Sequence, residues 1–121
     1  MATSVAWFMV FLGLAHIAYG VRKYRAPLRA AWVGGYIGQF AATEERRTAF
    51  WFLIFGPLLV LAGHAAQHAA ATGDLALLKI VGSYLLLTGV LGAAAFPKSP
   101  FWAAVPAGPL LIAAGYGWLS L

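Results

Sequence analysis

The sequence predicts an all-α protein that crosses a membrane as a four-helix transmembrane bundle. Of its 121 residues, 63% are hydrophobic and only 9% are charged, and the mean hydropathy is +0.84. Soluble domains carry roughly 25% charged residues, so this chain has too few to cover a water-exposed surface. It contains apolar runs of about 20 residues, the length that crosses a bilayer core about 30 Å thick as a helix. None of these runs alternates in polarity as a barrel strand does. The composition therefore excludes soluble, disordered and collagen-like proteins and leaves room for one domain.

Four apolar runs are long enough to be spans, and they lie at about residues 4–21, 48–71, 75–96 and 101–121. The first run precedes its basic residues, an order that favours a retained helix over a cleaved signal peptide. Pro57 lies inside the second run and leaves the carbonyl of Leu53 without its helical donor. Asp74 precedes the third run, where it is either an N-cap or a solvated loop residue. The fourth run contains Pro106 and Pro109, which predict bends.

The basic residues predict how the helices are oriented. Seven of the eight fall on one side of the predicted bundle: Arg22, Lys23, Arg25, Arg29, Arg46, Arg47 and Lys98. The positive-inside rule places that side in the cytoplasm and both termini on the outer side. Because the orientation of the helices in a membrane explains the excess of basic residues, we expect no nucleic-acid partner. The chain has no cysteine, which excludes disulfides and thiolate metal sites.

The long connection between the first two spans predicts an interfacial or re-entrant segment at about residues 26–43. Trp32, Tyr36 and Phe40 recur every four residues, which predicts three aromatic side chains along one helical face. Gly34 and Gly35 weaken a regular helix there. The segment is either an aromatic membrane anchor or a lid over a cavity that faces the cytoplasm.

Candidate catalytic residues gather at the predicted inner side. His16 and Tyr19 lie three residues apart in the first span, and Glu44, Glu45 and Arg47 lie at the start of the second span at a similar depth. A carboxylate that orients an imidazole beside an apolar interior is a minimal arrangement for proton transfer on a lipophilic substrate. The structural alternative is that the carboxylates favour the helix N-terminus, the arginines meet phosphate headgroups and His16 bonds to a neighbouring helix.

Candidate ligand-binding residues lie in the second span, toward its outer end. His64 and His68 are four residues apart, as in helical zinc sites, but no third ligand stands nearby and position 65 is alanine. We therefore expect no metal and no cofactor. The candidate ligand-binding set is His64, Gln67 and His68 with Trp51 of the same span, and the alternative is histidines bonded to water or backbone.

Three stretches resemble an uncharacterised family of small four-helix bacterial integral membrane proteins, a domain of unknown function. These stretches are residues 14–20 (LAHIAYG), 49–56 (AFWFLIFG) with Gly63 beyond it, and 96–102 (FPKSPFW) continuing to Pro106 and Gly108. Pro100 stands where the family typically has glycine. The chain is also distantly similar to DoxX-like four-helix proteins. The resemblance implies a shared four-helix fold and the bacterial inner membrane, and it carries no activity.

Three functions remain open from the sequence. The first is a non-catalytic module that binds a lipid or other hydrophobic small molecule between its helices. The second is a small membrane enzyme, of isomerase or cyclase type, that uses His16 and Glu44 or Glu45. The third is a structural subunit of a membrane complex. Small residues at helix spacing, such as Gly89 and Ala93, also offer a face through which the chain could form a homo-oligomer.

Overall fold

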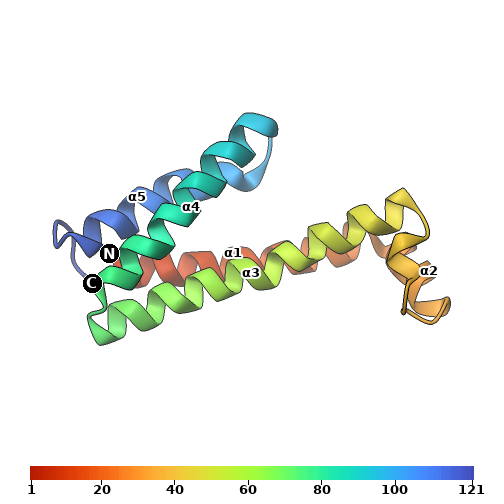
Figure 1. The fold of residues 1–121 in the computed structure, drawn as a ribbon, viewed down its shortest axis with the longest axis horizontal. Coiled ribbons are helices and arrows are strands. Elements are labelled where there is room, and N and C mark those ends of the chain that lie inside the picture. The colour runs from red at the N-terminus through yellow and green to blue at the C-terminus, as the bar shows by residue number, and fades with distance from the viewer. The chain divides into compact units, whose positions relative to one another are not determined.

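The computed structural model describes residues 1–121 and is entirely helical (Figure 1). Three helices, α1, α3 and α4, are long and apolar enough to cross a membrane. The all-α fold class is therefore confirmed. The elements in chain order are α1 (Ala2–Lys23), α2 (Arg25–Val33), the 3₁₀ turn η1 (Gln39–Ala41), α3 (Glu44–Thr72), α4 (Leu75–Ala95), the 3₁₀ turn η2 (Pro100–Ala103) and α5 (Ala104–Gly115).

The chain packs as two compact units, and α1 and α3 each contribute to both. The terminal unit consists of Met1–Val10 and Leu61–Leu121, and the central unit consists of Phe11–Val60. In the terminal unit, α4 packs against α5, and in the central unit, α2 lies across the end of the α1 and α3 pair (Figure 1).

Glycines set the close approach of helices within each unit. A Cβ at Gly82 would lie 2.7 Å from the carbonyl oxygen of Gly108, and one at Gly89 would lie 2.9 Å from the backbone nitrogen of Val105. In the central unit, a Cβ at Gly13 would lie 2.8 Å from the backbone nitrogen of Val60. At these positions the neighbour is backbone, which cannot move aside as a side-chain tip can. The helices therefore meet backbone to backbone, which is the usual use of small residues in membrane helices.

Three helices end in the same glycine-based motif. After α3, Gly73 has φ +72°, and the amide of Asp74 donates to the carbonyl of Ala69 at 2.9 Å. This is the Schellman arrangement, in which a left-handed residue lets the chain satisfy the last free carbonyls of the helix. Gly35 after α2 and Gly117 after α5 play the same part, with φ +103° and +75°. Asp74 then caps α4, because its Oδ1 accepts from the amide of Leu77 at 2.9 Å.

The helix in the fourth predicted span ends earlier in the structure than the sequence predicted. Its helix stops at Gly115 instead of continuing to residue 121, because the turn at Gly117 redirects the chain. The turn η2 has four residues and α5 has twelve, so the two together are shorter than the roughly 20 residues that a span needs. A fourth crossing of the membrane, and with it the four-helix bundle, stays a prediction.

The redirected C-terminus meets the N-terminus within the terminal unit. The amides of Ala2 and Thr3 donate to the carbonyls of Ser120 and Leu121 at 3.1 and 3.0 Å. The first amides of a helix have no partner inside it, so the C-terminal residues act as the cap of α1. The two ends of the chain therefore lie together, and their placement on the outer side of a membrane stays a prediction.

Candidate functional site

The central unit holds the predicted histidine site and also a groove in the aromatic segment for which the sequence predicted an anchor or a lid. His16 lies in α1 between Gly13 and Gly20, on the face that packs against α3. Its Nε2 donates to the carbonyl oxygen of Phe52 at 2.7 Å. Its ring stacks on that of Phe52 with centroids 4.1 Å apart and meets the edge of Phe55 at 5.6 Å.

The partner of His16 is therefore a backbone carbonyl of α3. The sequence predicted that Pro57 would free the carbonyl of Leu53, and the carbonyl that the imidazole reaches is the preceding one, of Phe52. A carbonyl oxygen only accepts hydrogen bonds, so Nε2 carries the proton and Nδ1 does not when the ring is neutral. The contact joins α1 to α3, which is a structural role.

The other catalytic candidates do not surround His16. Glu44 and Glu45 are exposed in the first turn of α3, and no hydrogen bond or ion pair joins either to His16. Glu45 lies seven residues before Phe52, about 10 Å of helical rise. Arg47 donates from Nη2 to the carbonyl of Ala41 at 3.3 Å.

Tyr19 is the one candidate that shares the surroundings of His16. Its ring lies 6.0 Å from that of Phe52 and beneath the ammonium of Lys23, at 5.7 Å. The structure thus brings three aromatic residues, Phe52, Phe55 and Tyr19, together with the imidazole of His16, without a carboxylate. An acid/base role for the five catalytic candidates stays a prediction.

The candidate ligand-binding residues are spread over both units. His64 and His68 are exposed and Gln67 is half-buried on the part of α3 that belongs to the terminal unit, whereas Trp51 belongs to the central unit. The side chains of His64, Gln67 and His68 make no hydrogen bond within the protein. No group of three or more His, Asp or Glu side chains that could hold a metal ion comes together in the chain. Ligand binding by this set stays a prediction.

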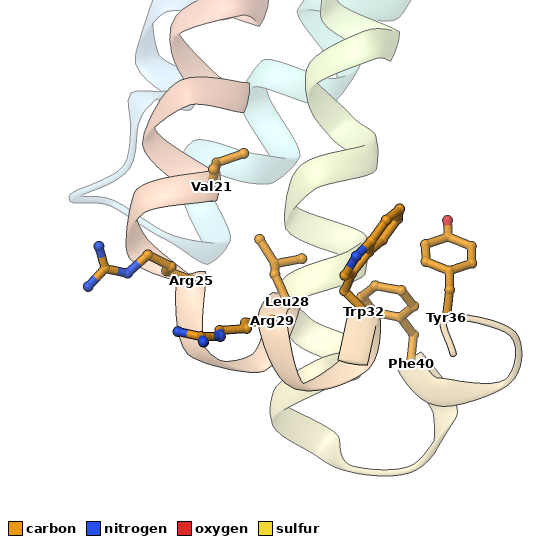
Figure 2. A pocket seen from close by; sticks show the side chains of 7 residues that line it. All are labelled: Val21, Arg25, Leu28, Arg29, Trp32, Tyr36 and Phe40. Atoms are coloured by element: carbon orange, nitrogen blue, oxygen red, sulfur yellow. The ribbon is translucent and has the colours of Figure 1, made fainter. Parts of the chain in front are cut away.

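A groove of about 350 Å³ lies on the central unit, along α2 and the turn that follows it (Figure 2). Its lining surface is almost entirely apolar, so the two arginines among its residues contribute mainly their aliphatic stems. The residues that line it are Val21, Arg25, Leu28, Arg29, Trp32, Tyr36 and Phe40.

The short helix α2 forms one wall of this groove for local reasons. Pro27 lies in its first turn, where a missing amide hydrogen costs no helical hydrogen bond. Pro27 and Ala31 are buried four residues apart, so they mark the face of α2 that packs on the unit. Arg25 and Arg29 are also four residues apart and exposed, on another face of the same helix.

The aromatic part of the groove does not follow one helix, contrary to the prediction. The helix ends at Val33, so only Trp32 belongs to it. The chain turns through Gly35 and Tyr36, and the rings of Trp32 and Tyr36 meet at 6.4 Å while those of Tyr36 and Phe40 meet at 5.3 Å. The three rings therefore do lie together, but a turn of the backbone brings them into contact and not the face of one helix.

Tyr36 is the single non-glycine residue with a positive φ, at +66°. This left-handed conformation is unfavourable for a bulky residue, by about 1 kcal/mol or more. It is held because the Tyr36 amide donates to the carbonyl of Ala31 at 2.9 Å and its own carbonyl accepts from the amide of Gln39 at 3.0 Å. A strained backbone position in the lining of a groove is the kind of outlier that clusters at binding sites.

The basic side chains of the central unit differ in whether they have a partner. Arg46 donates from Nη1 to Oε1 of Gln39 at 3.1 Å, and Arg47 donates to the carbonyl of Ala41. Arg25 and Arg29 form no hydrogen bond and no ion pair within the protein. The two arginines that line the groove are therefore free to bind something else.

Comparison with known proteins places the chain in a family. No curated protein and no solved structure shows significant similarity to it. The distant similarity to DoxX-like proteins stays a prediction. The model of one family, described as a family of unknown function (DUF6463), matches residues 1–118, and the chain therefore belongs to this family.

Proposed function

We propose that this protein is an integral membrane protein that binds a lipid or other hydrophobic small molecule in the groove along α2. The observation that carries the proposal is the groove itself, which offers about 350 Å³ beside Trp32, a side chain that is 74% exposed. Sites for small molecules typically measure about 300–1,000 Å³ and are lined mainly by apolar and aromatic side chains.

The length of α1 supports a position for this groove at the membrane surface. Its 22 residues extend about 33 Å, close to the hydrocarbon core thickness of about 30 Å. Arg22 and Lys23 end this helix, so α2 begins where the polar headgroups lie. By the positive-inside rule this is the cytoplasmic face, and the bacterial inner membrane is the corresponding location.

The interior between α4 and α5 is a poorer place for a ligand than the sequence suggested. A Cβ at Gly89 would already meet backbone at 2.9 Å, and one at Gly92 would meet the ring of Phe101. At Gly89 the helix α4 is in direct contact with α5, and at Gly92 it is in contact with η2, so no space for a ligand is left at these two positions. The proposal therefore moves the ligand from between the helices to the groove along α2.

Native mass spectrometry of the full chain, purified in mild detergent, tests this function. We expect the wild-type protein to retain a lipophilic molecule in fixed stoichiometry and the Trp32→Ala/Phe40→Ala variant to lose it. The matched control is Trp7→Ala/Phe8→Ala, which removes an exposed tryptophan and an exposed phenylalanine outside the groove. Equal retention by the groove variant, or equal loss by the control, would contradict the proposal. The same spectra report whether the chain forms a homo-oligomer.

A further inference from the structure

We infer that the groove selects an anionic phospholipid, whose phosphate is bound by Arg25 and Arg29 while an acyl chain lies along Leu28 and the aromatic rings. This inference rests on the proposed function and adds the chemical class of the ligand. It depends on three features of the groove, which are the free arginines, the direction from charged to apolar residues, and the absence of acidic side chains.

The two arginines form a pair that is suited to a phosphate. They lie one helical turn apart on α2, both are exposed, and neither has a partner in the protein. A guanidinium presents several N–H donors in a planar fork that matches the oxygens of a phosphate. Two such groups on one face can bind one phosphate from two sides.

The groove is apolar along its length, and its charge lies at one edge. Arg25 and Arg29 line it with their aliphatic stems, and their guanidinium groups extend beyond it. In Figure 2, the guanidinium groups of Arg25 and Arg29 extend on one side of the groove, and the rings of Trp32, Tyr36 and Phe40 gather on the other. Leu28 lies between the two groups. A ligand that fits this arrangement has an anionic end and an apolar end, which describes a phospholipid better than a soluble anion or a neutral hydrocarbon.

The charges around the groove favour an anion over a zwitterion. Two basic residues, Arg25 and Arg29, line the groove, and the acidic residues of the central unit are Glu44 and Glu45. Neither carboxylate lines the groove. The choline or ethanolamine group of a zwitterionic lipid therefore finds no carboxylate partner there, and its positive charge meets two arginines.

The test compares two lipids with identical acyl chains, phosphatidylglycerol and phosphatidylcholine, by titration into the full chain in neutral detergent, followed by native mass spectrometry. Each cationic residue near an anionic lipid surface strengthens binding about fivefold, so we expect about a 25-fold preference for phosphatidylglycerol from the pair. Arg25→Gln/Arg29→Gln should bind both lipids equally, at the affinity that the wild type has for phosphatidylcholine.

The control variant Arg22→Gln/Lys98→Gln removes the same two units of charge from exposed residues outside the groove, and its preference should stay near the wild-type value. An equal loss in this control would overturn the inference, since net charge would then explain the effect. Displacement of phosphatidylglycerol by an equal concentration of glycerol 3-phosphate would also overturn it, because the ligand would then be a free anion.

The failure of this inference and the failure of the proposed function give different results. If the wild type binds both lipids with equal affinity and Trp32→Ala/Phe40→Ala weakens both, the groove binds lipid without headgroup selection. If the wild type binds neither lipid and the purified protein retains no lipophilic molecule, the proposed function fails as well. The comparison of the two lipids on the wild type needs no variant, so the test does not depend on the folding of the arginine variants.

Discussion

Replacement of His16 by alanine is expected to destabilise the protein, because the imidazole joins α1 to α3. The substitution removes the hydrogen bond to the carbonyl of Phe52, at 2.7 Å, and the ring contacts to Phe52 and Phe55. A hydrogen bond contributes a net free energy of about 1 kcal/mol. Each aromatic contact contributes about 0.5–1.5 kcal/mol. The sum predicts that His16→Ala lowers the free energy of unfolding by about 3 kcal/mol.

Two further variants divide this effect between the ring and the hydrogen bond. His16→Phe keeps an aromatic ring and loses only the donor, so we expect a loss of about 1 kcal/mol. His16→Gln keeps a donor and loses the ring stacking, so its stability should fall between those of the alanine variant and the wild type. Equilibrium unfolding in detergent, followed by circular dichroism, measures all three.

The matched control for the His16 series is His64→Ala. His64 is exposed and its side chain makes no hydrogen bond, so the same chemical change there should alter the free energy of unfolding by no more than about 0.5 kcal/mol. Equal stability of the two alanine variants would refute the reasoning, since His16 would then have no structural role. That outcome is the one that the enzyme hypothesis expects of an acid/base residue.

Four other substitutions test the packing and the turns. Gly13→Ala should lower the free energy of unfolding by about 1–2 kcal/mol, because overpacking against the Val60 backbone outweighs the gain in helix propensity. Gly20→Ala, whose Cβ would meet only side-chain atoms, should cost less, and equal losses in the two unfolding curves would count against the argument. Tyr36→Asn relieves the strain of a tyrosine in the left-handed conformation but removes two ring contacts, so the free energy of unfolding should stay within about 1 kcal/mol of the wild-type value. Lipid retention in native mass spectra should fall, and unchanged retention would exclude a binding role for the ring. Gly117→Ala places a side chain at φ +75° and should cost about 1 kcal/mol in thermal unfolding, and an unchanged melting temperature would contradict the importance of that turn.

The long helices could be predicted from the sequence because hydropathy is a local property. The predicted spans 4–21, 48–71 and 75–96 correspond to α1, α3 and α4 with ends that differ by a few residues. The role of Asp74 as an N-cap was also predictable, since a cap bonds to the amide three residues ahead. Such features depend on neighbours in the chain and are therefore encoded within a few residues.

The site was less predictable because it depends on which residues meet across elements. The sequence placed His16 near Glu44 from their similar predicted depth, but depth does not fix which faces of two helices touch. The structure turns His16 toward the Phe52 carbonyl, since the glycines on either side of it bring α1 against α3.

The sequence by itself determined the helical, membrane-compatible character of this protein and the basic, aromatic content of the segment after α1. Only the tertiary structure decided that the chain turns at Gly35, that Tyr36 adopts a left-handed conformation, and that three rings and two free arginines line one groove. The physical reason is that hydropathy and charge add up along the chain. A groove, in contrast, exists only where the backbone turns bring separated side chains to the same place.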